Sequence, residues 1–263
     1  MKITSVDLIC FSATQTTART AQAIGAGTGL PVRVFDITAA QGQAGLPAAF
    51  GADELAVVGV PVYGGRVPPL AAARLAALQG SGTPCVLLCL YGNRAFDDAL
   101  AELYDLLAAR GFRAVAAAAF VGEHTFSARV AGGRPGPDDL AEARCFGRAV
   151  ARKLAAAPAV PALDPSRIPG GRPYKAAMGA LPFSAVAGEG CTRCGRCVAA
   201  CPAGALSLNG AVTVDGAKCI ACRACARVCP AGAIDLPAPV RKELAQHVEQ
   251  AFGKPDKPNL TIL

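Results

Sequence analysis

The first part of the chain alternates uninterrupted apolar runs with longer segments in which apolar residues recur at helical spacing. Apolar runs of strand length lie at residues 6–11, 32–37, 55–60, 84–90 and 113–120. The segments expected to form helices are residues 18–24, 68–78, 95–110 and 138–156. Strands that are apolar throughout and alternate with helices are typical of a parallel sheet covered on both faces. The pattern therefore predicts an α/β domain over residues 1–157.

The pattern changes after residue 157. Prolines and glycines recur without periodicity from 158 to 188, which predicts a semi-rigid linker. Residues 189–237 are rich in cysteine and form a second predicted domain. Residues 240–252 have the pattern of a short amphipathic helix, so residues 238–263 are expected to form a C-terminal helix and tail.

Three loops that follow predicted strands carry candidate binding residues. The first, Ser-Ala-Thr-Gln-Thr-Thr at residues 12–17, leads into a helix, and free N–H groups, hydroxyls and the helix dipole there favour an anion such as phosphate. The same residues would also serve as an ordinary helix N-cap. The other two loops begin at Pro61 and Tyr91, after the third and fourth strands. Open parallel sheets bind ligands at these carboxyl ends, so the three loops are expected to share a site.

Eight cysteines form two copies of the pattern C-x2-C-x2-C-x3-C-P, which start at Cys191 and Cys219. In bacterial iron-sulfur runs of this kind, three thiolates hold one [4Fe-4S] cluster and the fourth ligates the other. The first cluster is thus assigned to Cys191, Cys194, Cys197 and Cys229, and the second to Cys219, Cys222, Cys225 and Cys201. Zinc, which prefers separated pairs of thiolates, and disulfides, which need an oxidising compartment, fit this spacing less well. The remaining cysteines lack ligand spacing and are expected to be buried apolar residues: Cys10, Cys85, Cys89 and Cys145.

By these residues, the cysteine-rich segment resembles a bacterial two-cluster ferredoxin and residues 1–157 resemble a flavodoxin, so the chain resembles the fused flavodoxin-ferredoxin proteins. The resemblance implies a flavodoxin-like five-stranded parallel sheet in the order 2-1-3-4-5, a C-terminal two-cluster ferredoxin-like domain, two [4Fe-4S] clusters and FMN. It implies phosphate binding by Ser12, Thr14, Gln15, Thr16 and Thr17, ring stacking by Tyr63 and Tyr91, and further FMN contacts from Pro61, Val62, Gly64, Gly65, Gly92, Asn93 and Arg94.

Two residues near this site are singled out by the sequence. Gln15 stands where flavodoxins commonly carry a glycine, so the first loop must reach its shape in another way or bind phosphate more loosely. His124, after the fifth strand, is expected either to approach the flavin edge or a substrate, or to have a structural role only.

The formal charge of +7 is not interpreted as a nucleic-acid signal. Each [4Fe-4S] core with its thiolates carries about −2, and a flavin phosphate adds about −2 more, so the loaded protein is expected to be near neutral. Four arginines lie inside the cysteine runs: Arg193, Arg196, Arg223 and Arg227. We interpret them first as compensation for anionic clusters and second as a docking face for an acidic redox partner.

The sequence predicts a cytoplasmic protein. Its longest apolar run, residues 114–121, is far shorter than the roughly 20 residues that span a bilayer, so no membrane span is expected. The N-terminal run contains Asp7 and lacks the features of a signal peptide. A reducing, anaerobic cytoplasm is expected because exposed clusters degrade in oxygen.

Two functional hypotheses follow. The first is an electron-transfer protein that passes electrons between the clusters and FMN, exchanges them with redox protein partners and has no organic substrate. It rests on the lack of a nucleophile-base pair or a nicotinamide site outside the cofactor loops. The alternative is a flavin-dependent oxidoreductase, in which the clusters supply electrons for reduction of a small molecule or quinone. The sequence leaves a homodimer open.

Overall fold

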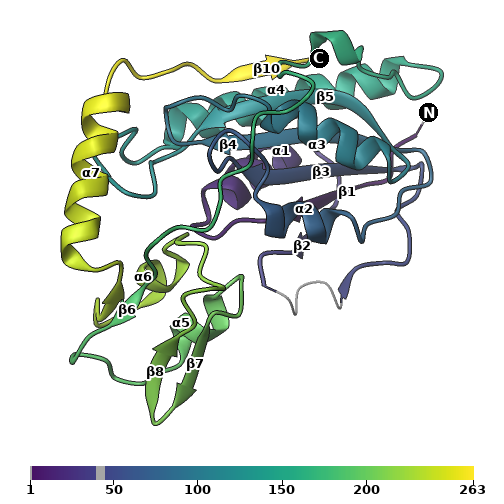
Figure 1. The fold of residues 1–263 in the computed structure, drawn as a ribbon. Coiled ribbons are helices and arrows are strands. Elements are labelled where there is room, and N and C mark those ends of the chain that lie inside the picture. The colour runs from purple at the N-terminus through teal and green to yellow at the C-terminus, as the bar shows by residue number, and fades with distance from the viewer. Residues whose placement is uncertain (1, 40–44) are drawn as a thin grey trace.

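One six-stranded sheet dominates the computed structural model, which describes residues 2–39 and 45–263 (Figure 1). Its strands are β1 (Ser5–Cys10), β2 (Val32–Asp36), β3 (Glu54–Pro61), β4 (Thr83–Tyr91), β5 (Phe112–Val121) and β10 (Leu260–Ile262). They lie in the order β10-β5-β4-β3-β1-β2, and all neighbours are parallel except β10 and β5. The parallel part has the order 2-1-3-4-5 of flavodoxin-like folds, which confirms the predicted fold class. The antiparallel strand β10 is an addition that the sequence pattern did not predict.

Helices cover both faces of this sheet. Helices α1 (Thr16–Thr28) and α4 (Pro137–Ala156) pack on one face, and α2 (Pro69–Leu75) and α3 (Ala99–Ala108) on the other. Alternate residues of each central strand enter the two cores; in β4, Leu87 faces α2 and α3, whereas Leu88 faces α1 and α4. The expected covering of both sheet faces is incomplete at β2, where Val34 is 58% exposed because this strand forms the sheet edge.

Close contact between α1 and α4 depends on glycine. A Cβ atom at Gly27 would lie 2.2 Å from the Arg144 carbonyl oxygen, and one at Gly147 would lie 2.0 Å from the Ile24 carbonyl oxygen. The close packing explains why glycine occupies these two positions, and α1 continues past Gly27 to its left-handed cap at Gly29. Among the described residues, even the longest helix, α4 with 20 residues, is not apolar enough to cross a membrane.

The cysteine-rich segment forms a small lobe at the carboxyl ends of the sheet strands (Figure 1). Its elements are β6 (Val186–Ala187), α5 (Arg196–Ala200), β7 (Leu206–Asn209), β8 (Ala211–Val214), α6 (Ala224–Val228) and β9 (Ile234–Asp235). Strand β6 pairs with β9, and β7 pairs with β8. Cysteines make up part of its core, which also includes Ala205, Leu206 and Ile234.

Two connections join this lobe to the sheet. The strap before it, which includes the short 3-10 helix η2 (Pro165–Arg167), is held on α3, where Asp105 accepts hydrogen bonds from Arg172 and Tyr174. After the lobe, α7 (Ala238–Phe252) runs along the side of the molecule and leads back to β10 at the sheet edge (Figure 1). The lobe is therefore tied to the sheet at both of its ends.

The four cysteines outside the spaced runs differ in burial. Cys10, Cys85 and Cys89 are buried in strands, as predicted, and burial is the main cause that raises the pKa of each thiol. The prediction is wrong for Cys145, which is exposed on the outer side of α4. Helical spacing places it away from the stripe, formed by residues such as Phe146 and Val150, that faces the sheet.

Candidate functional site

A cavity lies where the carboxyl ends of the strands meet the cysteine-rich lobe. It has a volume of about 810 Å³, open mouth included, and we call it the edge cavity. The sheet loops contribute Ala13, Thr14, Thr16, Thr17, Pro61, Val62, Tyr63, Gly64, Leu90, Tyr91, Gly92 and residues 122–126. The strap contributes Met178 and Leu181, and the lobe contributes Ile220, Ala221 and Cys222. The three sequence-predicted loops thus meet at one site, which the lobe closes from the other side.

The first loop brings the N-terminus of α1 to the edge cavity. Thr14, Thr16 and Thr17 line it, as expected of phosphate-binding residues. Ser12 does not: its hydroxyl accepts a hydrogen bond from the Ala18 N–H, and its own N–H donates to the Thr38 hydroxyl. Ser12 is not the N-cap residue, which is Gln15, but its hydroxyl satisfies an N–H of the first turn of α1, whereas the threonines line the cavity.

Gln15 also lies outside the cavity lining, but it shapes the loop. Its backbone adopts the left-handed conformation, with φ 65° and ψ 0°, directly before α1. Both its backbone N–H and its side-chain Nε2 donate to the Ser12 carbonyl oxygen, each over 3.3 Å. Gln15 thus adopts the left-handed backbone conformation that a glycine would adopt without strain. The loop keeps its shape, but the strain at Gln15 lowers the stability of the folded state.

Replacing Gln15 with glycine is expected to stabilise the protein. Relief of the left-handed strain is worth about 1–2 kcal/mol, and the greater freedom of an unfolded glycine offsets part of it, so a net gain of about 0.5–1 kcal/mol is expected in urea unfolding. The control is Gln15→Ala, which keeps the strain and removes the side-chain hydrogen bond. Equal stabilities of the two variants would contradict this account.

Two tyrosines line the edge cavity. Tyr63 follows β3, and burial, followed by the nearby Cys222, raises the pKa of its hydroxyl above the ordinary value. Tyr91 ends β4, packs edge-on against Phe96 with ring centroids 5.5 Å apart, and donates a hydrogen bond of 3.3 Å to the Pro258 carbonyl. Both tyrosines line the cavity, so both stay candidates for stacking on a ring.

Three further residues of the expected FMN set lie outside the cavity lining. Asn93 binds the C-terminal tail: its Nδ2 donates to the carbonyls of Phe252 and Pro255, and its Oδ1 accepts from the Lys257 N–H. Arg94 pairs with Asp97, and its carbonyl accepts a hydrogen bond from the Lys257 side chain. Gly65, with φ 87°, lies against Asp97. These residues hold loops and tail together, and direct contact with FMN stays a prediction for them.

His124 is the loop histidine that the sequence left between two roles, and it lines the edge cavity. Its Nδ1 accepts a hydrogen bond of 3.2 Å from the Phe126 N–H, which leaves Nε2 as the protonated nitrogen. Its ring also stacks against Phe252 of α7, at 6.3 Å between centroids. Burial lowers the pKa of His124 to about 4, so its imidazole is neutral at pH 7.

The lowered pKa predicts a stability change with pH. At pH values between about 6.5 and about 4, His124 is protonated more readily in the unfolded state than in the folded state. The free energy of unfolding therefore falls as the pH falls through this range. On going from pH 7 to pH 5, His124 is expected to account for a loss of about 2 kcal/mol. His124→Gln should lose correspondingly less over the same range in urea titrations. Parallel losses in both proteins would contradict the shift.

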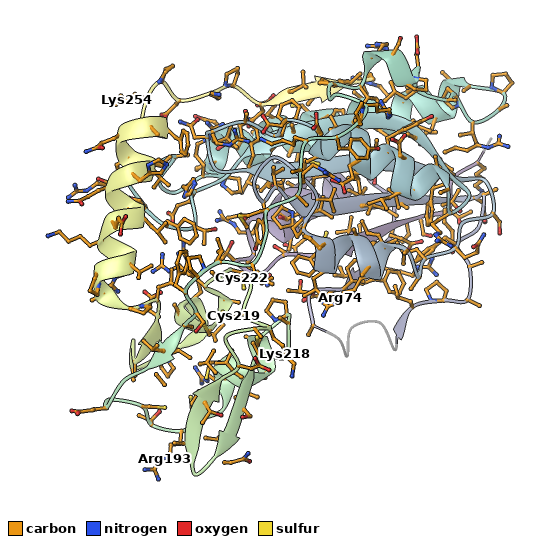
Figure 2. The ribbon with its side chains drawn as sticks, in the orientation of Figure 1. Arg74, Arg193, Lys218, Cys219, Cys222 and Lys254 are labelled. Atoms are coloured by element: carbon orange, nitrogen blue, oxygen red, sulfur yellow. The ribbon has the colours of Figure 1, made fainter. Side chains whose placement is uncertain are left out.

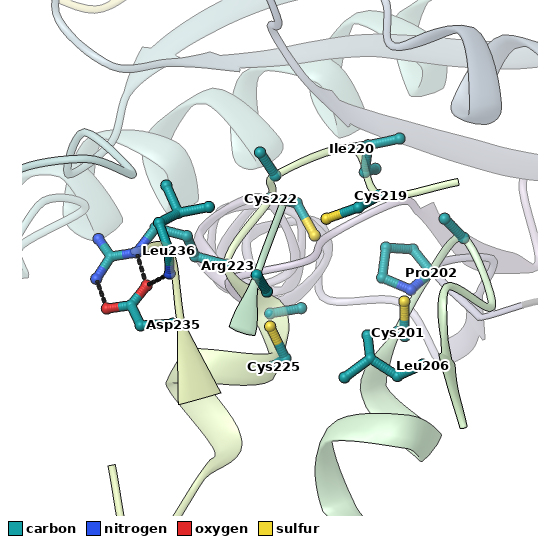
Figure 3. A pocket seen from close by; sticks show the side chains of 14 residues that line it. Cys201, Pro202, Leu206, Cys219, Ile220, Cys222, Arg223, Cys225, Asp235 and Leu236 are labelled. Carbon is teal, nitrogen blue, oxygen red and sulfur yellow. Dashed lines mark hydrogen bonds and ion pairs between the residues drawn. The ribbon is translucent and has the colours of Figure 1, made fainter. Parts of the chain in front are cut away.

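The eight spaced cysteines line two separate cavities, in the sets assigned from the sequence. Cys191, Cys194, Cys197 and Cys229 surround the first cage. Cys201, Cys219, Cys222 and Cys225 surround the second cage (Figure 3). In each, an alanine N–H donates to the fourth sulfur: Ala233 to Cys229 over 3.2 Å and Ala205 to Cys201 over 3.3 Å. Four sulfurs around a small cavity are the ligand set of a [4Fe-4S] cluster, so the residues fit that group.

Burial is the main cause that raises the thiol pKa to about 12 for Cys222 and to about 11 for Cys225. Both thiols are therefore protonated before metal binds, and ligation releases their protons. No group of three or more His, Cys, Asp or Glu side chains in the described part of the chain is arranged to hold a single metal ion.

The second cage and the edge cavity share a wall. Ile220, Ala221 and Cys222 line both of them, and Tyr63, whose hydroxyl lies near Cys222, also lines the edge cavity. Figure 2 shows Cys219 and Cys222 at the boundary between the lobe and the sheet. Sequence reasoning missed this contribution because nothing in the cysteine spacing shows which loop of the lobe faces the sheet.

The four arginines of the cysteine runs have different surroundings. Arg223 pairs with Asp235 at 2.7 Å (Figure 3), and its Nη1 donates to the Thr125 carbonyl over 2.5 Å. Arg227 pairs with Glu123. Together with Arg74, which donates to the Pro202 carbonyl over 2.6 Å, these contacts dock the lobe on the sheet loops. Arg193 and Arg196 make no ion pair within the described residues.

Comparison with known proteins gives one family and a set of solved structures. Residues 190–233 match the 4Fe-4S dicluster domain. No curated protein matches the chain. A flavodoxin from the domain Archaea is 17% identical and covers 58% of this chain and 99% of its own, with a TM-score of 0.40. A flavodoxin, WrbA-like protein from Agrobacterium tumefaciens is 18% identical and covers 59% and 98%, with a TM-score of 0.38. Rubredoxin oxygen:oxidoreductase from Desulfovibrio gigas is 14% identical and covers 59% and 36%, with a TM-score of 0.37.

The strand order and the family match together support an electron-transfer role. The protein joins a flavodoxin-like sheet to a 4Fe-4S dicluster domain in one chain, which confirms the fusion predicted from the sequence.

Proposed function

We propose that the chain passes electrons between two [4Fe-4S] clusters, held in the two cages, and FMN, held in the edge cavity. When bound, each cluster exchanges one electron at a time and the flavin exchanges two, so the protein would convert between one-electron and two-electron carriers. The observation that carries this proposal is the shared wall, because Cys222 is at once a cage residue and a lining residue of the edge cavity.

The residues of the chain have distinct tasks in this scheme. The N-terminus of α1, with Thr14, Thr16 and Thr17, would hold the phosphate. Ala221 and Cys222, which are 4% and 9% exposed, keep water out of the partition between the two cavities. Met178 and Leu181 of the strap add apolar cover on the same side. These tasks are met within one chain, so exchange between the cofactors requires no dimer.

Anaerobically purified protein tests the proposal directly. Its visible spectrum should show flavin bands on a broad iron-sulfur shoulder, with about eight iron atoms per chain. Cys194→Ser and Cys222→Ser form a matched pair, one in each cage, and each should lose about four iron atoms while the other cluster remains. Protein that lacks flavin bands, or whose iron content is unchanged in both variants, would overturn the scheme.

A second candidate, a flavin-dependent reductase of a small molecule or quinone, is favoured by one observation. His124 lines the edge cavity as a neutral imidazole with Nε2 protonated, and such a group donates a hydrogen bond to a carbonyl oxygen. Turnover of a soluble quinone by the reduced protein, lowered in His124→Phe, would support the reductase. Unchanged rates in this variant would favour the electron carrier.

A further inference from the structure

The two cages are built from matching halves of a duplicated sequence. Helices α5 and α6 each contain five residues and carry the third cysteine of their run. Arg193 and Ala221 occupy the same place, directly before the second cysteine, and both have a left-handed backbone, with φ 57° and φ 50°. The residue before the third cysteine is Arg196 in one half and Ala224 in the other. Each face of one cage therefore has a counterpart on the other.

These matched faces have opposite surroundings. In the second cage, Ala221 and Ala224 are 4% and 2% exposed, and the face that contains Ala221 and Cys222 is pressed against the edge cavity. In the first cage, Arg193 and Arg196 are exposed, and so is Cys194, the counterpart of Cys222. At these two matched positions, small side chains thus stand on the docked side of the lobe, and long cationic side chains stand on the side without a docking partner.

The exposed face is cationic. Arg193 and Arg196 have no carboxylate partner among the described residues, in contrast to Arg223 and Arg227. Arg193 lies at the end of the lobe that is farthest from the sheet (Figure 2). An open hollow between α5 and α6 is lined by Arg196, Arg227 and Cys229, so the first cage reaches the surface on this side as well. We call Arg193, Cys194 and Arg196 the basic face.

We propose that the basic face is the docking surface for an acidic one-electron carrier protein. The partner takes the position on the first cage that the sheet loops hold on the second, and its carboxylates meet Arg193 and Arg196. In this contact the reduced member of the pair loses one electron and the oxidised member gains it, with no bond made or broken. The proposal rests on the proposed function, because it takes the first cage to hold a cluster.

Binding of a small acidic ferredoxin to the cluster-loaded, full-length protein tests the basic face. At low ionic strength, Arg193→Glu/Arg196→Glu is expected to weaken binding about tenfold or more in calorimetric titrations. The matched control is Arg144→Glu/Arg152→Glu, which makes the same change in net charge at exposed positions of α4. Wild-type affinity should fall as salt is added, and amidation of the ferredoxin carboxylates should abolish binding.

Equal weakening in the control variant, or binding that survives both charge reversal and amidation, would overturn the proposal. If the reversed variant fails to load clusters, Arg193→Gln/Arg196→Gln provides the same comparison with a smaller expected loss. Chemical reduction by dithionite separates this test from that of the proposed function. Bleaching of the iron-sulfur shoulder reports on the clusters alone, whereas titration reports on docking alone.

Discussion

Removal of iron is expected to unfold residues 186–235 while the six-stranded sheet stays folded. The lobe has strands of only two to four residues, and its small core includes Cys197 and Cys225, so apolar burial alone cannot hold it. Structural metal sites in small domains contribute about 10 kcal/mol or more to folding. Because the lobe supplies Ile220, Ala221 and Cys222 to the edge cavity, FMN affinity should fall at the same time.

Hydrogen exchange measured by mass spectrometry checks this expectation. Amides of residues 186–235 should lose their protection after anaerobic chelation, and those of β4 and α4 in the same sample serve as the internal control. Persistent protection of the lobe in iron-free protein would show that its fold does not depend on the cages.

Asn93→Ala is expected to destabilise the protein by about 3 kcal/mol, or roughly 10 °C in Tm. Asn93 is 1% exposed, and three hydrogen bonds from its side chain to the tail disappear together in this variant. Chemical unfolding of the loaded protein measures the loss.

Truncation after Gly253 provides the control for Asn93, because it removes two of its three partners. Asn93→Ala in the truncated chain should cost much less than in the full chain, and a double-mutant cycle gives the difference. A loss of FMN affinity without a loss of stability would instead favour the direct flavin contact that the sequence predicts.

Much of the fold could be predicted because its signals are local. The apolar runs of β3, β4 and β5 are buried on both faces, and such runs are typical of central parallel strands. The tail could not be placed in this way, since β10 has only three residues and its position depends on distant partners such as Asn93 and Tyr91. A strand so short has no periodicity from which to predict it.

The part of the candidate site that could be predicted from the sequence is the grouping of the eight cysteines, whose spacing follows a known ligand pattern. The first three cysteines of each run line one cage because they lie within a short loop, whereas the fourth lines the other cage, which follows from the pattern of bacterial iron-sulfur runs and not from local spacing. The wall formed by Ile220, Ala221 and Cys222 depends on how two separately folding parts dock, and no spacing rule covers that. The same holds for His124, whose place in the edge cavity is set partly by Phe252 on α7.

The attachment of the lobe at both ends limits its freedom. The strap enters it from α3, and α7 and β10 return from it to the sheet edge. Domain swapping of the cysteine-rich lobe between two copies of the protein would therefore require both attachments to be released at once. If the cages and the edge cavity hold the proposed cofactors, their spacing should accordingly be independent of protein concentration, and a partner carrier would have to reach the lobe where it lies.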